Sequence, residues 1–163
     1  MKVLVTVASK HGATAEIGQA IADHLSGAGH EVDLRPPKEV HDLHGVDAAV
    51  VGSAVYAGHW VKSARKLIDR MGGELAGRPV WVFSSGPVGD PLQPTDESVD
   101  AAAALAVTRA REHRIFPGRI DTHRLQFGER VIVRSLRAAV GDFRDWDAVA
   151  RWAASIDAQL RAG

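Results

Sequence analysis

The fold is decided by the stretch Val3-Leu4-Val5-Thr6-Val7-Ala8, which runs directly into the turn Ser9-Lys10-His11-Gly12-Ala13-Thr14. The first six residues are mostly apolar and β-branched, and such a run predicts a strand buried on both faces, as in parallel sheets. Apolar or small residues then recur at helical spacing from position 17 to position 25. We therefore expect the turn to join the carboxyl end of a strand to the amino end of a helix, a position that binds anions.

The turn at 9–14 has the chemistry of a phosphate site. The first N–H groups of a helix have no partner within it and carry the positive end of its dipole, so phosphate oxygens can accept hydrogen bonds from them. Ser9 and Thr14 add hydroxyl groups, and Gly12 lets the backbone approach a ligand closely. The chain lacks G-x-x-x-x-G-K-[ST] and G-x-G-x-x-G, which favours a phosphomonoester over the ligands of a P-loop or a dinucleotide fold. The alternative is that Ser9 or Thr14 only caps the helix.

Composition excludes several classes of site. The 163 residues include no cysteine, which rules out disulfides, thiol nucleophiles, iron–sulfur clusters and thiolate zinc sites. No apolar run reaches the roughly 18 residues of a membrane span and no signal peptide is recognisable, so we expect one cytoplasmic domain over 1–163. His41 and His44 lie in an expected loop without a carboxylate-rich ligand set, and we expect no metal site there.

Predicted strands and helices alternate along the chain. Further strands are expected over 30–35, 47–53, 78–85 and 115–120, and helices over 61–71, 96–112, 125–140 and 143–160. The segment 30–35 alternates polar and apolar residues as an edge strand does, and Trp146 is placed in the apolar stripe of the last helix. The pattern predicts an α/β fold, a doubly wound five-stranded parallel sheet with helices on both faces and an extra helix before the last helix.

Three loops at the carboxyl ends of predicted strands form the candidate site, because open parallel sheets bind ligands there. Tyr56 and Trp60 offer aromatic faces for a flat ring, although packing in the core is the competing role for both. Gly58 allows a peptide to reorient, and the glycines of the third loop let the backbone approach a polar ring edge. The candidate binding residues are Ser9, Lys10, His11, Gly12, Ala13 and Thr14; Ala54, Val55, Tyr56, Ala57, Gly58, His59 and Trp60; and Ser84, Ser85, Gly86, Pro87, Val88 and Gly89.

With these three loops, the sequence resembles the flavodoxin family, whose members bind flavin mononucleotide (FMN). The family's phosphate loop is usually Thr/Ser-x-Thr-Gly-x-Thr, and this chain has His11 at the place of the middle hydroxyl residue. The resemblance implies that the backbone of 9–14 holds the FMN phosphate, that 54–58 contact the ring near its reactive nitrogen, and that 84–89 cover its pyrimidine edge. His59 is then a candidate hydrogen-bond donor to flavin or substrate, and structuring the loop is its alternative role.

The sequence is more closely similar to the menaquinone-dependent protoporphyrinogen IX dehydrogenases, a flavodoxin-like subgroup with an extra helical segment before the final helix. The similarity rests on Val51-Gly52-Ser53 with Gly58-His59-Trp60, on Gly118-Arg119-Ile120 with Glu129-Arg130-Val131-Ile132, and on Asp145-Trp146-Asp147 with Val149-Ala150 and Trp152-Ala153. It implies an FMN-dependent oxidoreductase that passes electrons from a reduced organic substrate to a quinone, and it assigns no catalytic residue. A flavodoxin-type electron carrier that docks to redox proteins and a flavin-free binding domain are the alternatives. The formal net charge of zero favours the enzyme, since typical carriers are strongly acidic.

The predicted helix over 125–140 is basic and amphipathic. One face carries Arg130, Arg134 and Arg137, and Ile132, Val133, Leu136 and Val140 lie largely opposite. Such a helix suits peripheral contact with an anionic membrane surface or with an acidic protein. The alternative is a solvated basic face above an ordinary core helix. No nucleic-acid partner is expected.

Overall fold

The computed structural model describes residues 1–86, 98–135 and 139–163. The strands are β1 (Lys2–Ala8), β2 (Glu31–Arg35), β3 (Ala48–Tyr56), β4 (His59–Trp60), β5 (Val80–Ser85), β6 (Glu112–Phe116), β7 (Arg119–Ile120) and β8 (Gly141–Asp142). The α-helices are α1 (Ala13–Gly27), α2 (Lys62–Leu75), α3 (Val99–Thr108), α4 (Phe127–Ser135) and α5 (Trp146–Ala162). Two short 3-10 helices, η1 (Pro37–Glu39) and η2 (Thr122–Arg124), complete the described elements.

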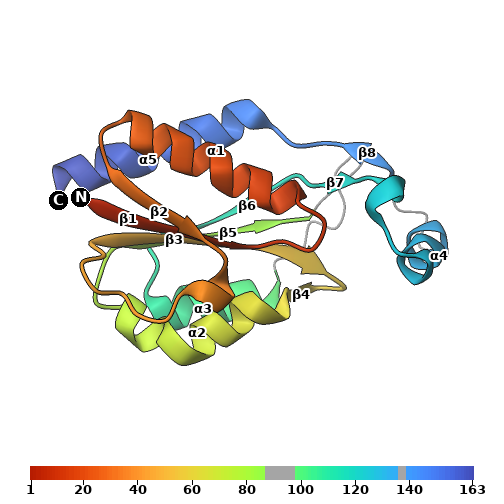
Figure 1. Ribbon diagram of the computed structural model, residues 1–163, viewed down its shortest axis with the longest axis horizontal. Helices are drawn as coiled ribbons and strands as arrows, with labels where there is room; N and C mark the ends of the chain where they lie inside the picture. The colour runs from red at the N-terminus through yellow and green to blue at the C-terminus, as the bar shows by residue number, and fades with distance from the viewer. Residues whose placement is uncertain (87–97, 136–138) are drawn as a thin grey trace.

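One sheet lies between two layers of helices (Figure 1). Five parallel strands follow the order β2-β1-β3-β5-β6, and the short β4 pairs antiparallel with the end of β3. The predicted doubly wound α/β fold is confirmed, with β2 at one edge as expected. The strand order reverses between β1 and β3, and in such sheets ligands bind at the carboxyl ends of the strands beside that reversal.

Each face of the sheet has its own hydrophobic core. Val3, Val5 and Val7 of β1 pack with residues of α1 and α5 on one face. Leu4 and Ala8 pack with residues of α2 and α3 on the other. Successive side chains of a strand point to opposite faces, so a strand covered on both sides is apolar along most of its length.

The predicted helix over 96–112 is longer than the observed one. α3 begins after Ser98, whose side chain accepts a hydrogen bond from the Asp100 N–H, and it ends at Thr108. Arg109 then takes a left-handed backbone conformation with φ +51°, which stops the helix. The alanine-rich pattern did not mark this end, because Ala110 and Arg111 are both good helix formers. Position 96 lies outside the described residues.

The predicted buried strand over 115–120 is wrong in position and in burial. β6 spans Glu112–Phe116 and forms the second edge of the sheet, so most of its residues are partly exposed. Pro117 cannot donate a ladder hydrogen bond, and the chain leaves the sheet there. The remainder of the predicted strand, β7, pairs instead with β8 in a separate two-stranded ribbon.

The segment from 117 to 145, here called the β6–α5 connection, carries β7, η2, α4 and β8. α4 lies beyond the end of the sheet and apart from the two helical layers (Figure 1). Phe127 is 83% exposed, and Val131 and Ile132 are more than half exposed, so α4 is not the core helix of the alternative interpretation. The helix is also shorter than the predicted 125–140, and 136–138 lie outside the described residues. Trp146 is partly exposed at the start of α5, where Arg144 lies 4.6 Å from its ring centroid, and it does not belong to the apolar stripe.

Candidate functional site

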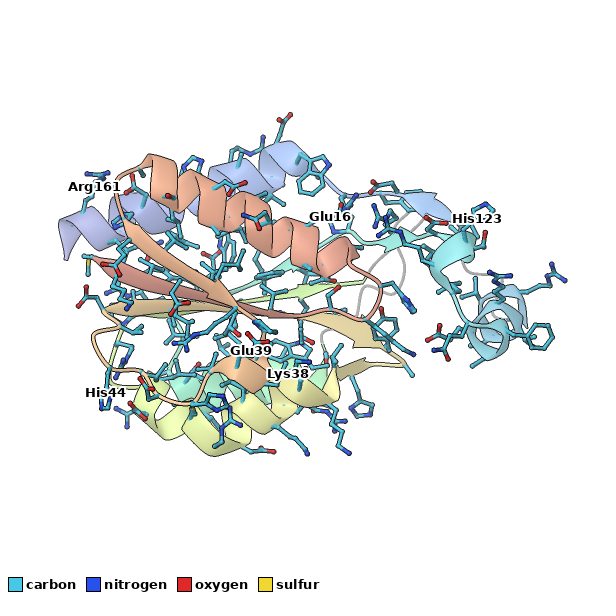
Figure 2. The ribbon with its side chains drawn as sticks, in the orientation of Figure 1. Glu16, Lys38, Glu39, His44, His123 and Arg161 are labelled. Carbon is cyan, nitrogen blue, oxygen red and sulfur yellow. The ribbon has the colours of Figure 1, made fainter. Side chains whose placement is uncertain are left out.

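A cavity of about 150 Å³ opens at the carboxyl ends of β1, β3 and β5. The loops after these strands form its inner wall, and the β6–α5 connection forms its outer wall. In Figure 2, Glu16 lies at the end of α1 that faces this connection, which carries the labelled His123. The lining residues are Ser9, His11, Ala13, Thr14, Ala54, Val55, Tyr56, Ser85, Gly86, Gly118, Arg119, Ile120, Asp121, Arg124, Leu125 and Val133.

The loop at 9–14 has the geometry expected of an anion site. The Gly12 N–H donates a hydrogen bond to Ser9 Oγ at 3.0 Å, which tightens the loop. Gly12 is the residue before α1 and has φ +89°, a conformation that favours glycine. Among the described residues, no acceptor binds the N–H groups of Ala13 and Thr14 at the start of the helix. Two backbone donors and the buried Thr14 side chain therefore face the cavity.

A carboxylate from α4 reaches this loop. Glu129 accepts a hydrogen bond from the Lys10 ammonium, and its Oε2 lies 3.2 Å from His11 Nε2. The Lys10 hydrogen bond, reinforced by one from the Gln126 N–H, lowers the pKa of Glu129 to about 2. Glu129 is thus a carboxylate at neutral pH, and it holds α4 against the 9–14 loop.

Tyr56 is the aromatic residue of the cavity. Its side chain is 40% exposed, its ring lies edge-on to His11 with centroids 6.1 Å apart, and the Lys10 Nζ lies 5.5 Å from its centroid. Partial burial, with a contribution from the Glu129 carboxylate, raises the pKa of Tyr56 to about 12. A neutral phenol with one open face is therefore available to a flat ligand.

A second charge network fixes the base of the β6–α5 connection. Arg144 is only 4% exposed and binds Glu16 Oε2 and Asp142 Oδ2, each at 2.6 Å. Arg119 contributes a longer contact to Glu16 at 3.3 Å. Hydrogen bonds from Arg144 lower the pKa values of both carboxyl groups, and the two carboxylates raise the pKa of Arg144. These ion pairs anchor the connection to the first turn of α1.

The loop after β3 is a two-residue hairpin turn. Tyr56 pairs with His59 across it, and both central residues have positive φ, +49° for Ala57 and +79° for Gly58. Of the residues predicted here, Ala54, Val55 and Tyr56 line the cavity, whereas Ala57 and Gly58 form the tip of the hairpin.

Three predicted site residues face away from the cavity. Trp60 is 2% exposed in the α2–α3 core, and its indole N–H donates to Ser84 Oγ at 2.8 Å. Ser84 also lies 2.9 Å from His113 Nε2. His59 lies 3.0 Å from Asp100 on α3, which matches the loop-structuring alternative. The tight hairpin reverses the chain, so β4 directs His59 and Trp60 toward α3, while Ser84 meets Trp60 from β5.

Seven lining residues were not among those predicted, and all belong to the β6–α5 connection. They are Gly118, Arg119, Ile120, Asp121, Arg124, Leu125 and Val133. The basic residues of this segment indicate that it can lie near an anion. Its periodicity does not show which side chains turn toward the 9–14 loop. From the third predicted loop, Ser85 and Gly86 line the cavity, and Pro87, Val88 and Gly89 lie outside the described residues.

The part of the chain that the structure describes contains neither a metal-binding cluster nor a membrane-spanning helix. No group of three or more histidine, aspartate or glutamate residues is arranged to hold a metal ion. Within the same residues, no helix has the length and apolar character needed to cross a membrane.

Known structures with this architecture include several flavodoxins. A single-residue mutant of the Pseudomonas aeruginosa flavodoxin is 17% identical, with a TM-score of 0.65 and 99% coverage of both chains. Oxidised flavodoxin 2 from Bacillus cereus is 25% identical, with a TM-score of 0.60 over 72% of this chain and 85% of that one. Rubredoxin oxygen:oxidoreductase from Desulfovibrio gigas is 15% identical, with a TM-score of 0.69. The match covers 99% of this chain but only 36% of the longer oxidoreductase chain.

The sequence itself matches a family model. No protein with a curated description matches the chain significantly. The model described as "Flavodoxin domain" matches residues 4–147. Because this match covers most of its length, the chain belongs to the flavodoxin family.

Proposed function

We propose that the chain is an FMN-dependent oxidoreductase that passes electrons from a reduced organic substrate to a quinone, in the manner of the protoporphyrinogen IX dehydrogenases that its sequence resembles. FMN is the cofactor of the flavodoxin family. When bound, it supplies the electron-transfer chemistry, and the protein binds the group, orients it and excludes water from it.

The residues of the cavity fit FMN. The unpaired N–H groups of Ala13 and Thr14 suit the phosphate, because they combine two donors with the positive end of the α1 dipole. Tyr56 offers a half-exposed aromatic face to a flat ring. Ser85 and Gly86, at the end of β5, place backbone groups along the third side of the cavity.

The observation that favours an enzyme over an electron carrier is the enclosure of the cavity by the β6–α5 connection. Leu125 and Val133 add apolar side chains to the outer wall, while Glu129 and Arg144 tie the connection to the 9–14 loop and to α1. A carrier that exchanges electrons with another protein needs its flavin edge at a flat, open surface. A walled cavity with apolar and basic lining is better suited to a small organic substrate.

The two functions differ in one measurement. Purified protein is reconstituted with FMN, freed of excess flavin and supplied with protoporphyrinogen IX and a menaquinone analogue. An enzyme of the proposed kind oxidises the substrate with the quinone as acceptor and needs no other protein. Reduction of the flavin without turnover, together with rapid oxidation by a redox protein, would support the carrier. Failure to retain FMN would support the flavin-free binding domain, to which His11 in the phosphate loop points.

The exposed face of α4 is the proposed contact with the membrane in which a quinone would be found. Phe127, Val131, Arg130 and Arg134 line a shallow groove there, so apolar side chains lie beside fixed positive charges. That combination suits the headgroup region of an anionic bilayer. Arg137, predicted for the same face, lies outside the described residues.

Sedimentation with vesicles tests this contact. Binding to vesicles rich in phosphatidylglycerol should fall on Val131→Ser and on Arg134→Gln and should weaken with salt, whereas neutral vesicles should bind poorly. Val99→Ser, which removes another exposed valine at the start of α3, is the matched control. If wild type and all three variants bind these vesicles equally, α4 is not the contact with the membrane.

A further inference from the structure

We infer that Arg124 is a phosphate-binding residue, supplied by the β6–α5 connection, that pairs with the FMN phosphate over the 9–14 loop and selects FMN over unphosphorylated flavin. The inference rests on the proposed FMN site, to which it adds a cation from a distant part of the chain. Three observations support the inference: the position of the Arg124 guanidinium, the unused hydrogen-bond donors of that group, and the absence of a side chain on Gly12.

The guanidinium of Arg124 lies directly above the loop. Its Nη1 donates to the His11 carbonyl oxygen at 3.2 Å. A Cβ atom on Gly12 would come within 3.2 Å of the same nitrogen. Glycine at this position therefore does two things, since it takes the left-handed backbone conformation and it leaves room for the guanidinium beside the first amides of α1.

Arg124 has more donors to spare than the other cations near the cavity. Arg119, the other arginine that lines it, is 16% exposed and donates to both carboxylate oxygens of Glu16, at 3.3 and 3.4 Å. Arg144 is almost fully buried and is paired at 2.6 Å with two carboxylates, and Lys10 is held by Glu129. Arg124 is 51% exposed, and its two carboxylate contacts are long, 3.9 Å to Glu16 and 3.7 Å to Asp121. A guanidinium carries five N–H donors, and the described residues give Arg124 one hydrogen bond, to the His11 carbonyl. The remaining donors match the oxygens of a phosphate monoester.

The hydrogen bonds of η2 hold the backbone of Arg124 close to the 9–14 loop. Asp121 caps the 3-10 helix by accepting a hydrogen bond from the His123 N–H at 3.0 Å, and the Arg124 N–H donates to the Asp121 carbonyl at the same distance. The capped turn thus holds the Arg124 backbone near the loop, and the hydrogen bond to the His11 carbonyl places the guanidinium there.

The competing role for Arg124 is to fasten the β6–α5 connection through the His11 carbonyl. A purely structural role would alter the binding of every flavin to a similar extent. A role toward the phosphate would alter FMN and spare riboflavin, because riboflavin has the same ring and ribityl chain and lacks the phosphate.

The test compares the binding of FMN and of riboflavin to the apo protein by quenching of flavin fluorescence, for wild type, Arg124→Gln, Arg124→Lys and Arg151→Gln. Arg124→Gln should raise the Kd for FMN at least about tenfold, the loss expected for a charge-assisted hydrogen bond. Its Kd for riboflavin should change by less than about twofold, as for a surface substitution. Arg124→Lys keeps the charge without the planar fork and should lie between wild type and Arg124→Gln. Arg151, exposed on α5 away from the loop, is the charge-matched control and should leave both Kd values unchanged.

Two results would overturn the inference. If wild type prefers FMN and Arg124→Gln weakens both flavins equally or neither, Arg124 does not bind the phosphate, while the FMN site stands. If wild type binds neither flavin, the proposed function fails and the role of Arg124 fails with it. Circular dichroism of each variant shows whether a loss reflects unfolding, and in that event Arg124→Lys decides between the two roles, since only the phosphate role predicts a changed ratio of FMN to riboflavin affinity.

Discussion

Glu129 in α4 accepts a hydrogen bond from Lys10 in the loop after β1, a contact between residues 119 positions apart in the chain. The same carboxylate lies beside His11. This pair joins the outer wall of the cavity to the 9–14 loop, so the position of the β6–α5 connection and the charge of the loop depend on each other.

Loss of the Glu129 carboxylate should destabilise the protein in a pH-dependent way. The pKa of Glu129 is lowered from 4.5 to about 2, chiefly by Lys10. A carboxylate with a lowered pKa contributes its stability in full above the unfolded value and loses it as the pH falls toward the folded value. The difference in the free energy of unfolding between wild type and Glu129→Gln should therefore be constant above about pH 5 and shrink toward pH 2.

Urea unfolding at a series of pH values measures this difference. Glu39→Gln, at an exposed position whose side chain makes no described contact, is the control and should change the free energy by less than about 0.5 kcal/mol. If wild type and Glu129→Gln differ in the free energy of unfolding by the same amount at pH 3 and pH 7, the charge of Glu129 does not contribute to stability.

Gly12→Asp should abolish FMN binding without unfolding the sheet. The new carboxylate would lie beside Arg124 and repel the phosphate from the amides of Ala13 and Thr14. Gly45→Asp controls for backbone strain, because Gly45 also has positive φ, +70°, and open space around it. Fluorescence titration with FMN should give no binding for the first variant and wild-type affinity for the second. Retained affinity in Gly12→Asp would contradict the assigned loop.

Ala57→Gly should stabilise the protein. Ala57 has φ +49° at the first central position of the β3–β4 turn, where an L-residue with a Cβ is strained. Relief of that strain should raise the free energy of unfolding by about 0.5–1 kcal/mol, measured in urea. Ala102→Gly, on the exposed face of α3, should lower it by about 1 kcal/mol. A loss of stability in both variants would mean that the turn is relaxed with alanine.

Ser84→Ala should weaken the fold and spare the cofactor site. The substitution removes the hydroxyl that accepts the indole N–H of Trp60, and a buried unpaired donor costs about 1–3 kcal/mol. FMN affinity should stay at the wild-type value, because both residues point into the α2–α3 side of the sheet. Ser26→Ala, at an exposed position in α1, is the control for stability. Weaker FMN binding with unchanged stability would show that Ser84 contributes to the cofactor site.

Local pattern was sufficient for β1, β2, β3 and β5 of the sheet and for the position of one loop beside the cavity. The apolar, β-branched run at 3–8 predicted a strand covered on both faces, and the helix after it followed from the spacing of its apolar residues. The loop between them needed no distant contact to define it. The same reasoning failed at Pro117, where the break in β6 depends on a hydrogen-bond ladder, and at Trp146, whose place beside Arg144 is set by the charge network of the β6–α5 connection.

The sequence by itself determined the doubly wound fold and placed the turn at 9–14 between a strand and a helix at the carboxyl edge of the sheet, because these follow from the periodicity of the strands and helices along the chain. Only the tertiary structure decided that Trp60 faces the core, that Tyr56 faces the cavity, and that Arg124 and Glu129 reach the loop from more than 110 residues away. The β3–β4 turn decides which way the side chains on either side of it point, and the residue types in the turn do not specify this direction. Contacts between distant segments depend on how the whole chain packs, so no local pattern of residues specifies them.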